Sequence, residues 1–311
     1  MPTIDPVKVD PAQLRQSFLA ASQGHELAEL EMASPVFDGK EELPQHRYLI
    51  LSTPRSGSYW LCRRLWQAGL GLPFEYLNRL HLQRFARRWN LPDPNLDQRR
   101  GWGRLKANLR QWSSTRPSAI RSSNVDSLEA YLEGVQQRRS LSGWFGLKVQ
   151  PVHLEELKID VEQRFSSWML LPLLRKDQRR QLASYLFSRV SGAYDLGIIT
   201  STRGESLNRL IDPILQERIA NLLAAQNKFI LQTAKSRTLQ PLWLEDLLLC
   251  SPEDLKRTLI PYLPALAKDD KILQPIQRRS DPLHRIKQEL LQDISDSLPE
   301  SLVDRLEQSI A

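Results

Sequence analysis

The 311-residue sequence is poor in the residues that bind metals or form disulfides. Its two cysteines, Cys62 and Cys250, are too few for a disulfide framework and too far apart for a Cys-x-x-Cys metal site. The five histidines show no His-x-His or His-x-x-x-His spacing that would bring two ligands together. We therefore expect no metal site and a reducing, cytoplasmic setting.

Long apolar runs are also missing. No stretch approaches the roughly 18 consecutive apolar residues that are typical of a membrane-spanning helix. The N-terminal sequence, MPTIDPVKVD, lacks the apolar core of an export signal. We therefore expect a protein that is neither inserted into a membrane nor exported.

Positive charge is in excess. Lysine and arginine number 43 against 36 aspartates and glutamates, which gives a formal net charge of +7. This excess favours anionic partners but leaves their kind open, from nucleic acid and anionic lipid to phosphorylated or sulfated nucleotides and acidic sugars. The hydrophobic content of 41% is that of an ordinary globular protein with a sizeable core.

Residues 47–66, RYLILSTPRSGSYWLCRRLW, contain the most informative local pattern. The apolar run at 48–51 is typical of a short buried strand, and TPRSGS at 53–58 is typical of a tight turn. Apolar residues then recur at helical spacing. A helix that begins near Ser58 directs its first N–H groups and its positive dipole end into a loop that already contains Arg55. Such a loop is suited to binding an anion.

Two alternatives apply to this loop. A strand, a serine-rich helix cap and a helix also occur in α/β proteins that bind no anion there. An ATP-binding P-loop is disfavoured, because the loop lacks the GxxxxGK[ST] pattern and has no lysine beside Ser58.

The remaining apolar patterns predict an α/β fold. Three further strands are expected at 144–149, 168–174 and 241–244. Helices are expected at 177–190, at 207–235 and from Pro252, where Ser251 is a suitable cap. Strands separated by helices predict a mostly parallel sheet of about five strands flanked by helices. Pro172 suits an edge or a bulge of such a sheet better than a central ladder.

The segment 79–121 is rich in arginine and tryptophan, which together can bind single-stranded nucleic acid. The alternative is a pair of helices with a solvated basic face and buried tryptophans. No RNP, zinc-finger or KH signature accompanies the segment, so we expect no nucleic-acid partner.

Five separated motifs are informative because of the order in which they occur along the chain. They are TPRSGSYW at 53–60, GLPFEYLN at 71–78, FGLK at 145–148, RKDQRRQLAS at 175–184 and RRSD at 278–281. In this order the chain resembles the bacterial sulfotransferases of the trehalose 2-sulfotransferase type, which belong to the P-loop-like sulfotransferase superfamily. WLEDL at 243–247 is similar to a YEDL element of that family. The resemblance spans about residues 47–285.

The resemblance implies a P-loop-like sulfotransferase fold and 3′-phosphoadenosine 5′-phosphosulfate (PAPS) as sulfuryl donor, with no metal. PAPS carries a 5′-phosphosulfate and a 3′-phosphate, so its protein needs two anion sites. The family pattern gives the first site to the loop residues Arg55, Ser56, Gly57, Ser58 and Tyr59. Tyr59 replaces a small hydroxyl residue of the wider group, so only its backbone N–H is carried over.

The second site, for the 3′-phosphate, is expected to combine a helix start with a late basic turn. Its residues are Arg175 or Lys176, Ser184, Arg278, Arg279 and Ser280. Lys176 stands where the family has a second arginine, and lysine cannot hold phosphate through two parallel hydrogen bonds as arginine does. The pattern leaves open whether Arg175 or Lys176 contacts the phosphate. The alternative is ordinary helix-surface charge followed by a basic loop.

The resemblance also implies two catalytic residues, Glu75 and Arg55. Glu75 is the expected general base for the acceptor hydroxyl, and Arg55 is expected to stabilise charge on the oxygen that leaves sulfur. Asn78 and Lys148 are expected to line the acceptor site. Without the family, Glu75 would be taken as a surface residue or the ion-pair partner of Arg79.

The expected organisation is a helical arm at 1–46, a sulfotransferase domain at 47–290 and a C-terminal helix at 291–311. Within the domain, residues 79–140 are the helical insertion expected to shape the acceptor site. The acceptor is expected to be a carbohydrate or another hydroxylated small metabolite. The rival functions are a phosphoryl transferase on a related fold and a non-catalytic nucleotide or nucleic-acid binder, and the oligomeric state, including a homodimer, stays open.

Overall fold

The computed structural model describes residues 32–33, 35–39, 43–94, 123–191, 193–195, 198–199, 212–269, 273, 291–292 and 294–311. Most of the predicted arm at 1–46 and much of the segment 79–121 lie outside the described residues. The predicted turn of Arg278, Arg279 and Ser280 lies outside them as well. The domain boundaries at 46 and 290 therefore stay predictions.

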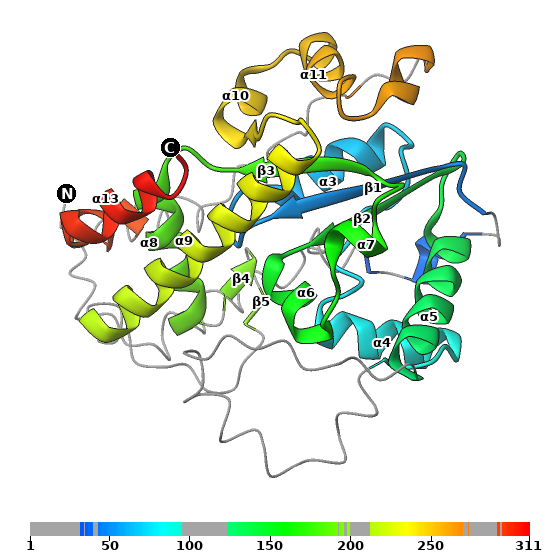
Figure 1. Ribbon diagram of the computed structural model, residues 1–311, viewed down its shortest axis with the longest axis horizontal. Coiled ribbons are helices and arrows are strands. Elements are labelled where there is room, and N and C mark those ends of the chain that lie inside the picture. The colour runs from blue at the N-terminus through cyan, green and yellow to red at the C-terminus, as the bar shows by residue number, and fades with distance from the viewer. Residues whose placement is uncertain are drawn as a thin grey trace.

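A parallel sheet of four strands organises the described part of the chain (Figure 1). Its strands, in sheet order, are β2 (Trp144–Val149), β1 (His46–Ser52), β3 (Met169–Leu174) and β6 (Leu242–Trp243). The predicted α/β class and parallel sheet are confirmed, and all four strands fall where the apolar runs predicted them. The predicted total of about five strands exceeds by one the four that the described sheet contains. A separate antiparallel pair joins β4 (Ala193–Asp195) to β5 (Ile198–Ile199).

Pro172 lies in β3, between two neighbouring strands. On one side it pairs in register with Leu51 of β1, whereas β6 on the other side pairs only with Leu173 and Leu174. At the level of Pro172, β3 is therefore an edge strand on its β6 side. This fits the expectation that proline, which has no N–H to donate, occupies an edge position.

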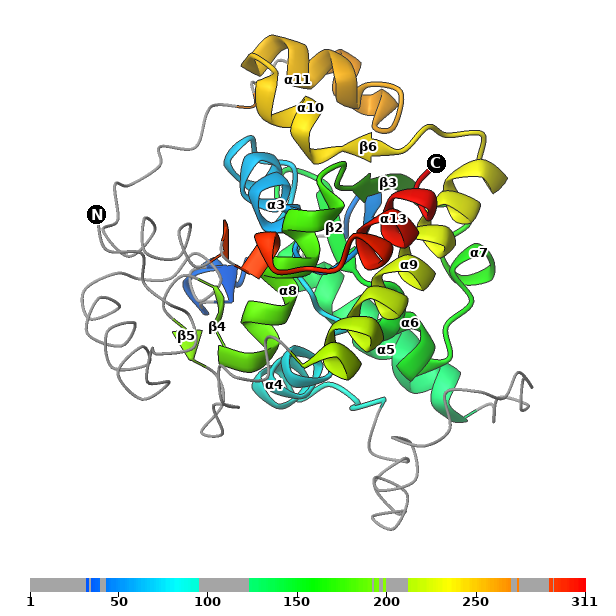
Figure 2. The same ribbon diagram turned by 90° about the vertical axis from the view of Figure 1, so that its left-hand side faces the viewer.

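Helices cover both faces of the sheet. Comparison of Figures 1 and 2 shows α3 on one face and α9 on the other. The described helices are α3 (Ser58–Gln67), α4 (Arg79–Trp89), α5 (Ser123–Arg139), α6 (Pro151–Leu157), α7 (Val161–Arg164), α8 (Gln178–Ser191), α9 (Pro213–Ser236), α10 (Leu244–Leu249), α11 (Pro252–Leu259) and α13 (Glu300–Gln308). Two 3-10 turns, η1 (Pro35–Phe37) and η4 (Pro264–Lys268), complete them. Among the described helices, none is both long and apolar enough to cross a membrane.

The helix ends follow the expected capping chemistry. Ser251 caps α11 as predicted, accepting a hydrogen bond of 3.1 Å from the N–H of Asp254. Asp212 caps α9 through the N–H of Ile214, and Pro213 occupies the first turn, where its missing N–H has no helical partner to lose.

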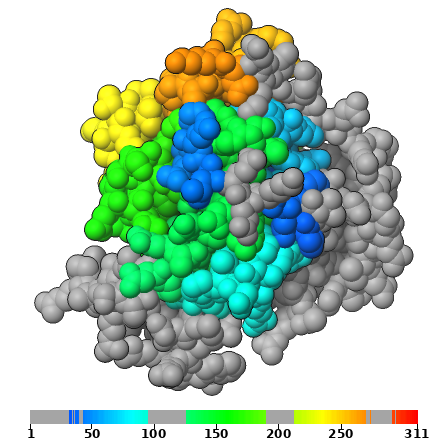
Figure 3. Space-filling view, turned by 90° about the vertical axis from the view of Figure 1, so that its right-hand side faces the viewer, coloured from blue at the N-terminus to red at the C-terminus, as the bar shows by residue number. Residues whose placement is uncertain are grey.

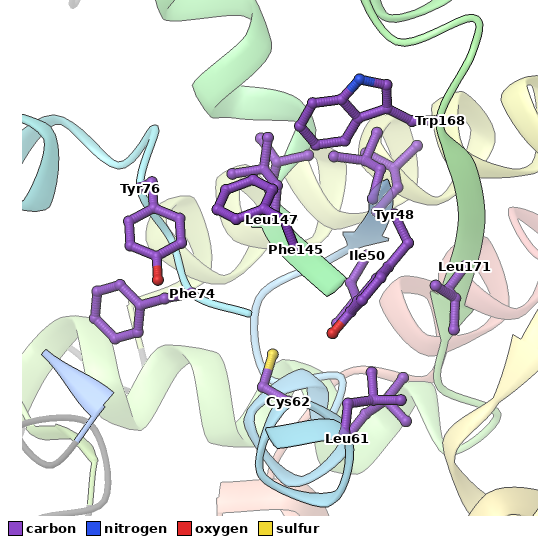
Figure 4. Close-up of a cluster of buried hydrophobic side chains, with 14 of the residues drawn as sticks. Tyr48, Ile50, Leu61, Cys62, Phe74, Tyr76, Phe145, Leu147, Trp168 and Leu171 are labelled. Carbon is purple, nitrogen blue, oxygen red and sulfur yellow. The ribbon is translucent and has the colours of Figure 1, made fainter. Parts of the chain in front are cut away.

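Part of the main core lies between the sheet and α3. Figure 4 shows side chains of β1, β2, β3 and α3 in one cluster, together with two aromatic rings from the segment after α3. These two residues, Phe74 and Tyr76, are fully buried. The Tyr76 ring stacks on the Phe145 ring, with the ring centroids 5.8 Å apart. Because this segment is held by core aromatics, the residue between them, Glu75, has a fixed position.

A buried ion pair fastens the start of the described chain to α4 and α5. Arg139, whose side chain is fully buried, lies 2.6 Å from the carboxylate of Asp38, and Trp89 donates to the same carboxylate at 2.8 Å. Arg139 also donates to the carbonyl of Met32 at 3.0 Å. Figure 3 shows the dark-blue residues of this segment beside the cyan surface of α4. The segment is thus joined to the helices through a charge that water cannot solvate.

We expect Asp38→Ala to lower the free energy of unfolding by about 3 kcal/mol, because it leaves the Arg139 guanidinium buried without its counter-ion. Urea unfolding measures the loss. The matched control is Glu217→Ala, which removes the exposed partner of Arg305 and should cost less than about 0.5 kcal/mol. Equal losses in the two variants would contradict a structural role for the Asp38–Arg139 pair.

Candidate active site

The loop between β1 and α3 is curled by two residues in the left-handed region. Arg55 has a φ of 61° and Gly57 has a φ of 74°. Gly57 is the N-cap of α3 and provides no side-chain cap, while the Ser56 hydroxyl donates to the carbonyl of Thr53 at 2.8 Å. The helix begins at Ser58, where the sequence predicted its start, and the amides at this end are not bonded by a capping side chain.

Gly57 is required by space as well as by its backbone angle. A Cβ at this position would lie 2.4 Å from Cδ1 of Leu244, the first residue of α10. The loop therefore packs directly on the turn that follows β6. This contact joins the predicted donor loop to the WLEDL motif.

Helix α8 and the residue that follows β3 also contact the loop. Arg55 Nε donates to the hydroxyl of Ser184 at 2.9 Å, although the two residues are 129 positions apart. Arg175 in turn donates to the Arg55 carbonyl at 3.2 Å. The structure thus brings together residues that were assigned to two separate anion sites.

Arg175 and Lys176 have different surroundings. The Arg175 side chain, 15% exposed, points toward the loop, with Glu245 3.6 Å away. The Lys176 side chain is 50% exposed and pairs with Asp246 at 2.6 Å. Glu245 also accepts hydrogen bonds from the N–H groups of Lys176 and Asp177, at 2.8 and 3.1 Å. Arg175 is therefore the residue of the two that contacts the loop.

Two glycines, which have no side chain, let the segment that leads to Glu75 approach β2 closely. A Cβ on Gly146 would lie 2.4 Å from the Tyr48 hydroxyl, and one on Gly71, where φ is +83°, would lie 2.6 Å from the Trp144 carbonyl. Phe74 then forms a parallel bridge with β2, its carbonyl accepting from the N–H of Lys148 at 3.0 Å. The next residue is Glu75, which this bridge sets beside the Lys148 side chain.

Glu75 is 5% exposed and is surrounded by hydrogen-bond donors. Its Oε1 accepts from Lys148 Nζ at 2.6 Å and from Gln150 Nε2 at 2.9 Å, and its Oε2 accepts from Asn78 Nδ2 at 3.2 Å. Burial disfavours the charged form, but the Lys148 ammonium group outweighs it and lowers the pKa of Glu75 to about 2. Glu75 is thus a buried carboxylate paired with Lys148, and neither a surface residue nor a partner of Arg79.

Lys148 links Glu75 to the start of α3. Its Nζ lies 3.6 Å from the centroid of the Tyr59 ring, in addition to its contact with Glu75. Tyr59 is the second residue of α3. Lys148 therefore connects the Glu75 carboxylate to the first turn of the helix that follows the predicted donor loop. The Tyr59 side chain therefore takes part in the site, whereas only its backbone N–H was predicted to do so.

Sequence reasoning missed three residues of this region. Gln150 contacts Glu75, His153 Nε2 lies 3.4 Å from Asn78 Nδ2, and Gln181 contacts the loop. Gln150 had a usable signal, because it lies two positions after Lys148 and strand alternation gives both the same side. His153 had none, since a lone histidine is more often a core residue. Burial lowers the pKa of His153, so it is neutral near pH 7.

These features define the class of the protein. An anion-suited loop, a cation at a second strand end and a buried carboxylate nearby agree with group transfer from an anionic donor, and comparison with protein families supports a sulfotransferase. The family model described as Stf0 sulphotransferase matches residues 47–183, so this segment is similar to that family. The match includes Arg55, Glu75, Lys148 and Arg175 and ends one residue before Ser184, so the resemblance seen in the motifs is confirmed. No curated protein matches the chain significantly.

We expect Gly57→Ala to destabilise the protein more than Gly143→Ala. Both glycines have positive φ, 74° and 76°, so alanine costs each about 1 kcal/mol of backbone strain. At position 143 the nearest atom to a new Cβ is 3.7 Å away, whereas at position 57 Leu244 must move. Overpacking should add at least about 1 kcal/mol at position 57, measured by urea unfolding. Equal losses would show that Leu244 does not confine the loop.

We expect Lys148→Met to destabilise the protein by about 3 kcal/mol near pH 7, because the buried Glu75 carboxylate loses its counter-ion. In the wild type the lowered pKa makes the pair stabilising above the ordinary carboxyl pKa, and this contribution is lost as pH falls toward about 2. In the variant burial raises the pKa of Glu75, so protonation removes the penalty as pH falls.

The stability difference between the wild type and Lys148→Met should therefore shrink between pH 7 and pH 4, in urea unfolding at several pH values. The control is the double variant Lys148→Met/Glu75→Gln, which has no carboxyl to titrate and should be more stable than Lys148→Met at pH 7. A stability difference that is constant with pH would contradict the pairing.

Proposed function

We propose that this sulfotransferase takes its sulfuryl group from PAPS and transfers it to a hydroxyl of a carbohydrate or another small metabolite. The observation that carries the proposal is the contact between Arg55 of the loop and Ser184 of α8, with Arg175 bonded to the same loop residue. A donor with two anionic ends needs two sets of hydrogen-bond donors within the length of a nucleotide, and these contacts supply them from two strand ends.

In the proposed arrangement, the phosphosulfate binds at the start of α3. Its partners are the backbone N–H groups there, including that of Ser56, together with the Arg55 guanidinium and the Ser58 hydroxyl. The 3′-phosphate binds Arg175 and Ser184, with the predicted turn of Arg278, Arg279 and Ser280 as a further contributor. Lys176 is a weaker candidate than Arg175 because its ammonium group pairs with Asp246, away from the loop contacts. The proposed chemistry needs no metal.

The reaction is a displacement at sulfur. The acceptor oxygen forms a bond to sulfur as the bond from sulfur to the bridging phosphate oxygen breaks, and the nucleotide leaves as 3′-phosphoadenosine 5′-phosphate. Arg55 and the α3 N-terminus stabilise the negative charge that builds on the bridging oxygen, which lowers the barrier because this charge is larger in the transition state. The hydroxyl proton goes to Glu75.

Oε2 of Glu75 is the atom suited to accept this proton. Oε1 accepts from both Lys148 and Gln150, whereas Oε2 accepts one hydrogen bond, from Asn78, among the described residues. With a pKa near 2, the carboxylate is ionised at neutral pH but is a weak base. The bonds from Gln150 and Asn78 keep it oriented while the proton arrives.

The acceptor is proposed to lie against Asn78, Gln150 and Lys148. Amide groups can donate to and accept from a substrate that carries several hydroxyls, which favours a carbohydrate over an apolar alcohol. We also propose that the enzyme acts in the cytoplasm, in keeping with its two cysteines, both of which are free thiols. A homodimer is compatible with this proposal.

The test is calorimetry and transfer assay with Glu75→Gln. We expect the variant to bind 3′-phosphoadenosine 5′-phosphate within about threefold of the wild type but to transfer sulfate about 100 to 10,000 times more slowly, because the proton acceptor is lost while the residues proposed to bind the donor are unchanged. The acceptor is found beforehand by offering labelled PAPS to a pool of cell metabolites.

Glu155→Gln, a change of an exposed carboxylate on α6, is the control and should transfer at the wild-type rate. Normal transfer by Glu75→Gln would mean that another group takes the proton. A wild type that shows no saturable binding at micromolar nucleotide would overturn PAPS as the donor.

A further inference from the structure

Helix α8 presents an unusual inward face to the donor loop. Gln178, Gln181, Ser184 and Ser188 recur at helical spacing and are all 5% exposed or less. A buried helical face is normally apolar, and each buried polar group needs partners. The hydrogen-bond partners of these four residues include groups of the donor loop and Asn227 of α9, which is itself bonded to the residue after α13.

The hydrogen bonds of Gln181 are directed at the backbone of the loop. Its Nε2 donates to the Thr53 hydroxyl and to the Pro54 carbonyl, both at 2.7 Å and both buried. The Pro54 carbonyl belongs to the peptide that precedes Arg55, and that peptide is trans. Holding the carbonyl toward α8 therefore turns the Arg55 N–H to the opposite side.

The carboxamide of Gln181 is itself oriented by the next residue in the stripe. Gln178 Nε2 donates to Gln181 Oε1 at 3.2 Å and to the Arg175 carbonyl. Since Gln178 presents its NH2 group, Gln181 must present its oxygen there and its NH2 group to the loop.

The chain of bonds continues to the C-terminal helix. Asn227 of α9 donates to Gln178 Oε1 at 2.9 Å and to the hydroxyl of Ser309, which follows α13, at 3.0 Å. Figure 2 shows α13 beside α9, with α8 nearby. Each of the three amide groups thus uses both of its protons, so a reversed amide at any position would set oxygen against oxygen.

We propose that Gln181 is a positioning residue of the donor loop, and that Gln178 and Asn227 hold it in the one orientation that fixes the peptide before Arg55. The effect on the loop stands on the contacts alone. The effect on donor binding rests on the proposed function, because it requires the loop to bind the phosphosulfate of PAPS.

The test compares Gln181→Met with Gln226→Met. Methionine has nearly the length and volume of glutamine and makes no comparable hydrogen bonds, so Gln181→Met leaves the Pro54 carbonyl and the Thr53 hydroxyl without their donor. Gln226 is a buried glutamine of α9, 4% exposed, whose amide atoms have no hydrogen-bond partner in the described part of the chain. It is therefore a matched control for the loss of a buried carboxamide.

Two readouts are measured: hydrogen exchange of the amides at 55–58 without ligand, and the dissociation constant for 3′-phosphoadenosine 5′-phosphate. Gln181→Met should speed exchange in the loop at least about tenfold and weaken nucleotide binding by a similar factor. Gln226→Met should leave both within twofold. Melting temperatures identify any change that is merely global.

Unchanged exchange and unchanged binding in a folded Gln181→Met would overturn the proposal. If the wild type itself bound no nucleotide, the proposed donor would fail while the exchange measurement still judged the role of Gln181. If Gln181→Met does not fold, Gln178→Met replaces it, since that variant frees the Gln181 carboxamide without touching the loop. Loop exchange equal to the wild type in Gln178→Met would then overturn the proposal.

Discussion

The parallel pairing of β1 with both β2 and β3 is the constraint on which the site depends. Parallel strands end at the same edge of the sheet, so the segments that follow them must meet there. The loop at 53–58 follows β1, Gln150 follows β2 and Arg175 follows β3. Leu244 and Glu245 follow β6 and contact the neighbouring loop and helix start. Residues that are far apart in the sequence become neighbours because of this one register.

Charge balance is the second theme of the site. Glu75 is neutralised by Lys148 and Arg175 is flanked by Glu245, each pair with an N–O distance below 4 Å. A buried or half-buried charge without such a partner would be costly. The pairing with Lys148 also lowers the basicity of Glu75. The scaffold therefore gains stability from interactions that also restrain the reactive groups.

The sequence predicted the fold more completely than the site. The four strands follow from short apolar runs, and the loop follows from its proline, glycine and serines, because these are local signals. The ion pair between Glu75 and Lys148 could not be foreseen, since it depends on a one-residue bridge between Phe74 and Leu147. Gln181 lies within the motif at 175–184 but was given no role, because a glutamine in a basic helix start is normally expected at the surface. Its burial arises only when α9 and α13 pack over α8.

The backbone of Arg55 has a strained conformation. A φ of 61° suits glycine or asparagine, and an arginine there is strained even though its side chain and its carbonyl are both hydrogen-bonded. A variant library screened for heat resistance would accumulate glycine or asparagine at position 55. If Arg55 stabilises the leaving oxygen as proposed, a library screened for turnover would retain arginine. The residue found at this one position would therefore report which of the two properties a laboratory lineage had been selected for.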